Sequence, residues 1–139
     1  MWRNIFSWFN KPKPRLVPDE QKDGFWKEFN KQGVLISEGN FDKGLRTGKW
    51  KLYYETGELV IEENYANGKM EGTFKSFYKN GRLISEGQYR DNKREGIFKI
   101  FNDAGDLVKR MIFKNDSLIE EENIPNNLSP TDIEFPVLL

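Results

Sequence analysis

The side chains that enzymes use most often for nucleophilic, acid–base and metal chemistry are scarce in this chain. Its 139 residues include no cysteine and no histidine, which excludes disulfides, thiol catalysis and Cys-ligated zinc and removes the commonest general base. Carboxylate pairs occur at Glu62-Glu63 and in the run Glu120-Glu121-Glu122, but neighbouring residues of a strand point to opposite faces. We therefore expect no catalytic residue, no metal site and no cofactor, and we predict that the protein is not an enzyme.

Two columns of charged residues recur at a fixed spacing. A catalytic site would mark one copy of a repeat rather than every copy, so we interpret both columns as cross-strand charge ladders, in which each pair contributes about 0.2–1 kcal/mol. The 22 Lys and Arg residues balance the 22 Asp and Glu residues. A dedicated nucleic-acid binder needs surplus positive charge, so we expect no nucleic-acid partner. The columns are Lys27, Lys51, Lys75 and Lys99, and Glu38, Glu62 and Glu86.

These columns belong to a repeat of 24 residues that occurs four times without insertion or deletion. A period of this length indicates an array of supersecondary units. Glycine, aromatic and leucine columns keep the same register. They are Gly24, Gly48, Gly72 and Gly96; Gly33, Gly57, Gly81 and Gly105; Trp26, Trp50, Phe74 and Phe98; Phe29, Tyr53, Phe77 and Phe101; Leu35, Leu59, Leu83 and Leu107; and Phe41, Tyr65, Tyr89 and Phe113.

Each copy has the pattern of a β-hairpin. An aromatic-rich strand precedes a three-residue turn such as 31–33, whose final glycine suits a left-handed position with a G1 bulge. A second turn, such as 66–68, leads to the next copy. Its glycine is replaced by Asn92 and Asp116 in copies three and four, two residue types that tolerate left-handed geometry. The pattern predicts an all-β fold, an elongated antiparallel meander of four stacked hairpins with eight strands.

The three-residue turn also predicts which side chains share a face of the sheet. It places Phe29 opposite Leu35, with Phe41 on the same face, and we expect this face to hold the core. The aromatic column that begins with Trp26 then lies on the opposite face, together with Glu38 and its equivalents. A bulge would exchange residues between the two faces.

The two ends of the chain fall outside the repeat. Residues 1–10 place several aromatic residues near one helical stripe, and they lack the uninterrupted apolar stretch and the small-residue cleavage site of a signal peptide. We therefore expect a cytoplasmic protein. The segment is either an end cap on the neighbouring sheet, a partly disordered arm, or an interfacial membrane contact through residues 1–13. The aromatic and apolar residues of the stripe are Trp2, Ile5, Phe6, Trp8 and Phe9.

Prolines separate these ends from the repeats. Pro12, Pro14 and Pro18 indicate an extended linker, and the C-terminal segment is either a strap over the last repeat or a flexible tail, its apolar final residues favouring the strap. The predicted regions are an N-terminal aromatic segment with a Pro-rich linker at 1–23; four repeats at 24–119, divided as 24–47, 48–71, 72–95 and 96–119; and a C-terminal strap or tail at 120–139.

The second copy shows the repeat most fully. Gly48, Trp50, Tyr53, Tyr54, Gly57 and Leu59 follow the pattern G-x-W-x-x-Y-Y-x-x-G-x-L, and Tyr65, Asn67, Gly68, Lys69 and Gly72 follow Y-x-N-G-K-x-x-G. This unit resembles the MORN-repeat variant and, more closely, the bacterial YwqK-type antitoxin family built from it. The resemblance spans about residues 24 to 119, and the fourth copy departs from it at Asp116 and Glu120. It implies stacked hairpins in a curved sheet and an antitoxin, an immunity protein or, more broadly, a protein-binding module.

The leading hypothesis for function is therefore a small cytoplasmic protein that binds and neutralises a partner, such as a cognate toxin, through its sheet. Aromatic residues are common interface anchors. Tyr54 and Tyr78 occur only in the middle copies, where the outer copies have Asn30 and Asn102, which suggests a local surface feature. The tryptophans have an alternative role, filling space against the terminal segments. The predicted partner-binding residues are Trp26, Trp50, Tyr54, Phe74 and Tyr78.

Two hypotheses from other classes remain beside it. One is a membrane-associated scaffold anchored by the N-terminal Trp/Phe segment, although the repeats supply no basic cluster for anionic lipid. The other, in third place, is an enzyme. The residues favour neither face of the sheet as the binding face and no particular oligomeric state.

Overall fold

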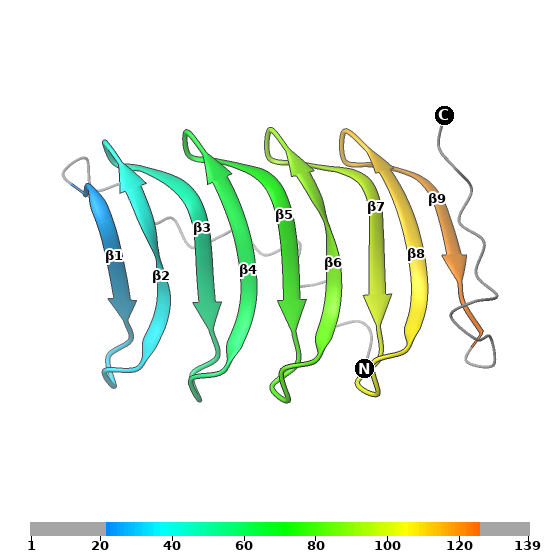
Figure 1. Ribbon diagram of the computed structural model, residues 1–139, viewed down its shortest axis with the longest axis horizontal. Helices are drawn as coiled ribbons and strands as arrows, with labels where there is room; N and C mark the ends of the chain where they lie inside the picture. Colours follow the sequence, from blue (N-terminus) through cyan, green and yellow to red (C-terminus); the bar gives the residue numbers. More distant parts are fainter. Residues whose placement is uncertain (1–21, 126–139) are drawn as a thin grey trace.

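The computed structural model describes residues 22–125. Within that range the chain forms nine β-strands and no helix, and all nine strands belong to one sheet whose spatial order follows the chain (Figure 1). Every neighbouring pair is antiparallel, so the predicted all-β antiparallel meander is confirmed. The strands are β1 Gly24–Phe29, β2 Leu35–Asp42, β3 Leu45–Tyr53, β4 Leu59–Ala66, β5 Lys69–Phe77, β6 Leu83–Arg90, β7 Lys93–Phe101, β8 Leu107–Lys114 and β9 Ser117–Asn123.

The three-residue turns within the hairpins have the predicted geometry. In the third hairpin the backbone N–H of Gly81 donates to the carbonyl of Tyr78 at 2.9 Å, and the N–H of Tyr78 donates to the carbonyl of Arg82 at 2.8 Å. Gly81 has a φ of 83°, a left-handed conformation that costs a residue with a β-carbon about 1–2 kcal/mol. The glycine column at the end of this turn is therefore a backbone requirement.

The turns that link one hairpin to the next have two left-handed residues each. Asn67 and Gly68 have φ values of 49° and 78°, as a type I′ turn requires at both central positions. Where the glycine is replaced, the geometry persists: Asn92 has a φ of 65° and Asp116 one of 68°. The prediction that these two residues adopt left-handed conformations is confirmed.

The sheet continues one strand beyond the eight that the repeats predict. The turn at Asn115 and Asp116 leads into β9, which pairs with β8 through contacts such as Arg110 opposite Glu122. The strand therefore occupies the first residues of the segment predicted as a strap or tail. The rest of that segment, the N-terminal aromatic stripe and the Pro-rich linker lie outside the described residues, apart from the last residues before β1.

The two faces of the sheet are divided differently from the prediction, which was wrong in placing Phe41 opposite to Trp26. Phe29 does oppose Leu35, but the next pair is Glu28 with Ser37, so Ile36 is an extra residue in β2. Because side chains alternate between faces, one extra residue moves every later side chain of the strand to the other face. Phe41 consequently shares the face of Trp26. The same extra residue recurs at Val60, Ile84 and Val108.

The core therefore contains two of the aromatic columns on one face, which we call the aromatic face. Its rings contact one another edge to face, with centroids 5.0 Å apart for Phe41 and Trp50 and 5.4 Å apart for Phe98 and Phe113, a geometry that adds to the free energy of burial. Phe29, predicted for the core, is instead 56 % exposed. The aromatic face comprises Trp26, Phe41, Trp50, Tyr65, Phe74, Tyr89, Phe98 and Phe113.

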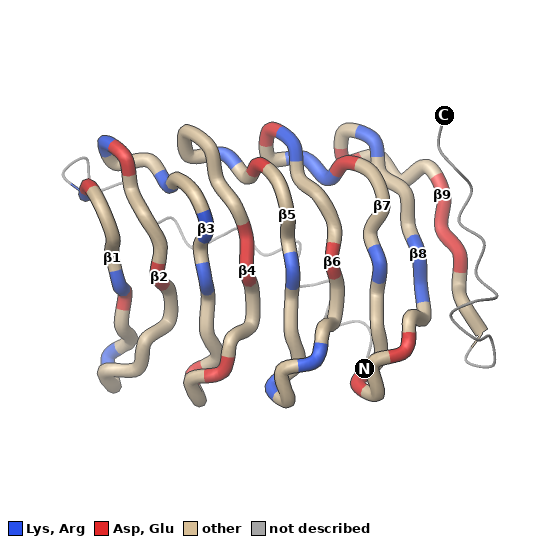
Figure 2. Tube along the Cα trace, in the orientation of Figure 1, with Lys and Arg blue, Asp and Glu red and all other residues tan. Residues whose placement is uncertain are grey.

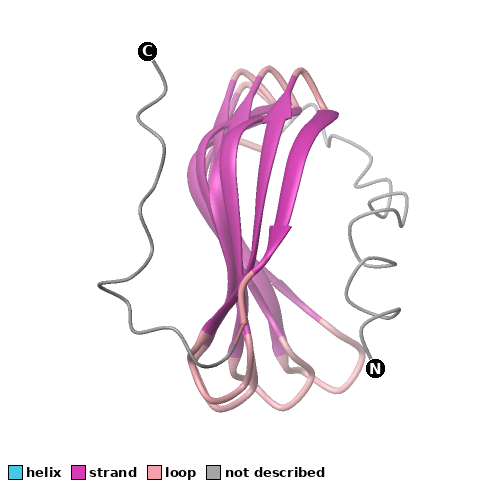
Figure 3. Ribbon diagram, turned by 90° about the vertical axis from the view of Figure 1, so that its right-hand side faces the viewer, coloured by secondary structure: helices cyan, strands magenta, loops and turns pink. Residues whose placement is uncertain are grey.

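Two glycines allow these rings to lie directly on the strands. A β-carbon on Gly39 would meet the indole of Trp50 at 2.3 Å, and one on Gly87 would meet the ring of Phe98 at 2.5 Å. Neither glycine has a positive φ, so close approach rather than backbone conformation requires them. Seen from the side, the described strands form a single bent and twisted layer (Figure 3).

Candidate functional site

Three of the predicted partner-binding residues lie on the aromatic face and build the core. Trp50 is 0 % exposed and Phe74 is 5 % exposed. The indole N–H of Trp50 donates to the carbonyl of Asn40 at 3.0 Å, and that of Trp26, which is partly buried, donates to the carbonyl of Asp23 at 2.9 Å. In this structure Trp50 and Phe74 offer a partner almost no surface, whereas Trp26 keeps part of its ring accessible. Their role as partner anchors stays a prediction.

The other two, Tyr54 and Tyr78, lie at the turn end of the hairpins and connect neighbouring repeats. The hydroxyl of Tyr54 donates to the carbonyl of Phe77 at 2.9 Å, and the hydroxyl of Tyr78 donates to the carbonyl of Phe101 at 3.0 Å. The ammonium of Lys79 lies 5.4 Å from the centroid of the Tyr54 ring. Burial is the main cause that raises the pKa of both phenols. Both side chains remain partly exposed, so this pair has a framework role in addition to any contact with a partner.

The asparagines that replace these tyrosines act within their own turns. The side-chain oxygen of Asn30 accepts hydrogen bonds from the backbone N–H groups of Gln32 and Val34, both at 2.9 Å. In the last hairpin the side-chain oxygen of Asn102 accepts from the N–H of Asp106 at 2.8 Å. Asparagine therefore stabilises its own turn, whereas tyrosine reaches across to the next repeat.

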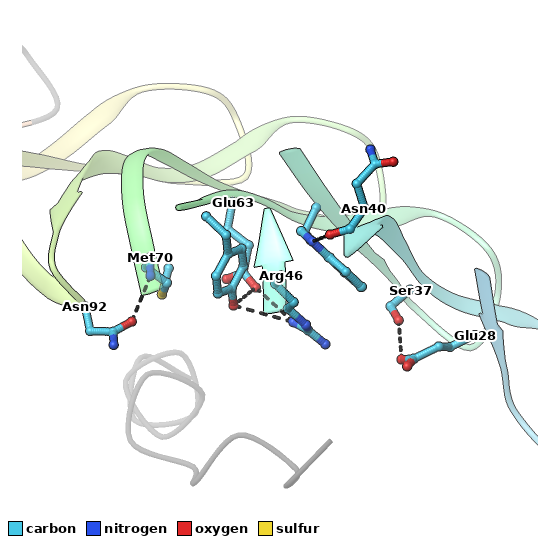
Figure 4. A network of polar contacts seen from close by, with 9 residues as sticks. Glu28, Ser37, Asn40, Arg46, Glu63, Met70 and Asn92 are labelled. Carbon is cyan, nitrogen blue, oxygen red and sulfur yellow. Dashed lines mark hydrogen bonds and ion pairs between the residues drawn. The ribbon is translucent and has the colours of Figure 1, made fainter. Parts of the chain in front are cut away.

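A buried polar network lies in the middle of the aromatic face (Figure 4). The carboxylate of Glu63, only 3 % exposed, accepts a hydrogen bond from the hydroxyl of Tyr65 at 2.6 Å and lies 3.7 Å from the guanidinium of Arg46. The same guanidinium lies 4.0 Å from the centroid of the Trp50 ring. Burial and the neighbouring carboxylate raise the pKa of Tyr65. A buried carboxylate with these partners stabilises one arrangement of the surrounding side chains.

Sequence reasoning missed this network, although the repeat contains a signal for it. Glu63 stands 24 residues after Gly39 and 24 before Gly87, where a carboxylate replaces the glycine on which a ring would lie. Read as part of the pair Glu62-Glu63, it suggested only poor acid–base geometry. Aligning the copies column by column would have singled it out.

The opposite face carries a row of charged residues with one member on each strand, which we call the charge row. Figure 2 shows positive and negative residues alternating across the middle of the strands from β2 to β7. Ion pairs join Lys27 to Glu38 at 3.8 Å and Lys99 to Glu86 at 3.5 Å. The interpretation of the columns as cross-strand ladders is confirmed by this pairing. The charge row is Lys27, Glu38, Lys51, Glu62, Lys75, Glu86, Lys99, Arg110 and Glu122.

The ladder changes order at its C-terminal end. Arg110 stands where the other hairpins have glutamate, so it follows Lys99 with the same sign of charge. It is compensated by β9, because Glu120 and Glu122 lie 3.2 Å and 3.3 Å from its guanidinium nitrogens. The acidic run that offered an unlikely catalytic pair is thus part of the ladder.

A second row, entirely apolar or aromatic, lies beside the charge row on the same face. Each hairpin contributes one cross-strand pair next to its three-residue turn, such as Tyr53 opposite Leu59 and Phe77 opposite Leu83. All members are partly or fully exposed. The hydroxyl of Tyr53 donates to Glu38 at 2.6 Å, and burial together with this carboxylate raises the pKa of Tyr53 to about 12. This apolar row is Phe29, Leu35, Tyr53, Leu59, Phe77, Leu83, Phe101 and Leu107.

We call the face that bears both rows the open face. In the range 22–125, no cluster of three or more His, Cys, Asp and Glu side chains is placed to hold a metal ion. The same part of the chain has no helix long and apolar enough to cross a membrane.

Comparison with known proteins identifies the repeat. The family model of the MORN repeat variant matches residues 46–67 and 70–91, which contain most of β3 and β4 and of β5 and β6. The sequence resemblance to this repeat is confirmed for these two adjacent copies. No curated protein matches the chain. MORN repeats form a non-catalytic family and are generally modules that bind proteins or membranes.

Proposed function

We propose that this chain is a non-enzymatic cytoplasmic protein-binding module of the bacterial antitoxin or immunity type, which binds and neutralises a cognate toxin through its repeat sheet. The observation that supports it best is the open face, where the apolar row lies beside the charge row on a sheet of repeats that match a binding family. The chain's lack of cysteine and histidine supports a role in binding rather than in catalysis.

The architecture suits recognition for a physical reason. A repeat sheet presents a broad surface that is rigid before a partner arrives, so little conformational entropy is lost on binding. The apolar row supplies area to bury, and the charge row supplies orientation because only a complementary pattern of charges avoids repulsion. Tyr54 and Tyr78 extend this surface at the turn end, and Trp26 extends it at the edge of the aromatic face.

The experiment begins with the recovery of the tagged full-length chain from its native cells and identification of the bound protein by mass spectrometry. That protein is then expressed alone and together with this chain. We expect growth arrest when the partner is expressed alone and recovery when both are expressed. A partner that leaves growth unchanged, or an arrest that co-expression does not relieve, would contradict the antitoxin proposal.

The same assay tests the predicted anchors. A chain with Tyr54→Ala and Tyr78→Ala is expected to lose affinity for the recovered partner while keeping its circular dichroism spectrum. Asn30→Ala with Asn102→Ala is the matched control, since it alters the equivalent positions of the outer hairpins without removing a ring. Unchanged affinity of the tyrosine variant, with an intact fold, would reject the pair as anchors.

A membrane-associated scaffold is the second candidate, because modules of this repeat family also bind membranes. Its anchor would be residues 1–13, which lie outside the described residues. Flotation with liposomes that contain anionic lipid separates the two functions. Binding that disappears when residues 1–13 are deleted favours the scaffold, and no binding by either chain rejects it.

A further inference from the structure

The open face has the features of a protein–protein interface rather than of a solvated sheet surface. One side of an antiparallel sheet commonly faces water and is then lined by polar residues. Here eight apolar or aromatic residues form a continuous row on that side, from Phe29 to Leu107. Contiguous apolar patches of this kind mark sites of association. Among the described residues no second layer packs on it, since all nine strands belong to one sheet.

The size of the face fits a stable dimer. Nine strands spaced by about 4.8 Å and about eight residues long give a surface of roughly 38 Å by 27 Å, or about 1,000 Å². Standard stable interfaces bury about 800 Å² on each partner. The face therefore has enough area for one protein partner of ordinary interface size, provided that most of it is covered.

The charges on this face favour a second copy of the same chain as the partner. The charge row holds five cations and four carboxylates, and the whole chain has a formal net charge of zero. Two copies consequently meet without net repulsion, and a chain with no net charge associates more readily than a strongly charged one. A partner of strong single-sign charge would gain little from a row that alternates.

We propose that the open faces of two copies pack together in a two-fold symmetric sandwich. A two-fold axis along the apolar row brings the two apolar rows into contact and places the two charge rows on opposite sides of them. The contact then has an apolar centre with a charged rim, as protein interfaces commonly do. Twisted sheets cross at about 30°, so the contact is closest at the middle hairpins, around Tyr53, Leu59, Phe77 and Leu83.

The dimer has a consequence for binding that goes beyond the proposed function. A partner that uses the open face must displace the second copy, so the free concentration of the chain sets how much binding surface is available. Self-association is tested without any other protein, and a monomeric result leaves the antitoxin proposal untouched.

The first test is sedimentation equilibrium of the full chain, whose mass is 16.4 kDa. We expect an apparent mass that rises toward twice this value as the concentration increases from about 1 µM to about 100 µM, the range in which a moderately stable dimer forms. The variant Leu59→Lys/Leu83→Lys is expected to remain monomeric. The matched control is Leu45→Lys, which changes an exposed leucine outside the apolar row and should still dimerise.

A second measurement uses the natural sequence and so does not depend on how the double variant folds. Because the chain has no cysteine, a spin label can be attached at a single introduced site, Lys75→Cys on the open face or Ser117→Cys at the start of β9. Packed sheets lie about 10 Å apart, so we expect a distance between labels shorter than about 30 Å at position 75 and a longer or broader one at 117. A monomer at every concentration, or a dimer without a short distance at position 75, would overturn the proposal.

Discussion

At the scale of single residues, the positions that matter most are those where one column of the repeat departs from its usual residue. Gly39 and Gly87 let Trp50 and Phe98 lie on the sheet, while Glu63 replaces that glycine in the second copy and joins Arg46 and Tyr65 instead. The sequence contains each of these residues in plain view. Their consequences follow only from the contacts, because spacing shows which copies differ and not what the side chains meet.

Replacing Gly87 by alanine should destabilise the sheet. The new β-carbon would lie 2.5 Å from the ring of Phe98, and forcing an extra carbon into a packed core costs about 1–3 kcal/mol. Chemical denaturation measures the free energy of unfolding. The neighbouring exposed residue provides the control, since Gln88→Ala should change stability by less than about 0.5 kcal/mol; equal effects of the two changes would show that the ring does not lie over Gly87.

Alkaline pH should weaken the fold through Tyr89. Burial is the largest cause that raises the pKa of this phenol, from 10.0 to about 12. The unfolded chain therefore loses the proton first, and stability that is full below pH 10 is lost as the pH rises toward 12, by the order of 2 kcal/mol. Tyr89→Phe should make the fall in stability between pH 10 and 12 shallower. Identical pH profiles for both proteins would mean that Tyr89 is not buried.

At the scale of elements, the hairpin is the unit that sequence predicts well and the bulge is the feature it hides. Glycine and asparagine columns predict both kinds of turn, and the structure confirms their left-handed residues. The extra residues Ile36, Val60, Ile84 and Val108 are ordinary strand formers, so nothing in their type reveals that each is unpaired. That one residue in each hairpin decides which aromatic column joins the core. For the same reason three of the predicted anchors proved to be core-facing.

The hydroxyl groups of Tyr54 and Tyr78 should contribute to the contact between successive hairpins. Tyr54→Phe and Tyr78→Phe keep the ring and remove the hydrogen bond to the next repeat, so each should lower the free energy of unfolding by about 0.5–1.5 kcal/mol. Hydrogen exchange should show faster opening at the turn ends of the affected hairpins. No change in either measurement would mean that the two hydroxyls bond to water instead.

At the scale of the whole molecule, the protein is one sheet whose two faces have different roles. The aromatic face holds the core, and the open face combines an apolar row with a ladder of paired charges. Repetition predicted the meander and the ladder, since both follow from period and turn type. It did not predict β9, because Ser117–Asn123 lacks the aromatic residue of the other odd-numbered strands. The acidic residues of β9 nevertheless complete the ladder beside Arg110.

Such a sheet should be stable only as an array. A peptide of residues 24–47 contains one complete hairpin, which cannot bury its aromatic side chains without the next hairpin. We expect it to be unfolded, with poorly dispersed amide resonances in its nuclear magnetic resonance spectrum, whereas the full chain gives a dispersed spectrum. A folded isolated hairpin would show that stacking is not what stabilises the repeats.

The division into a core face and an open face is tested most directly by hydroxyl-radical footprinting of the full chain at low concentration, read residue by residue by mass spectrometry. Phe25, 60 % exposed, and Phe29 should be oxidised rapidly, while Trp50, 0 % exposed, and Phe98, 2 % exposed, should be protected. Unfolding the protein should abolish the difference. Trp50 and Phe98 reacting as fast as Phe25 in the folded protein would contradict the assignment of the faces and the binding surface built on it.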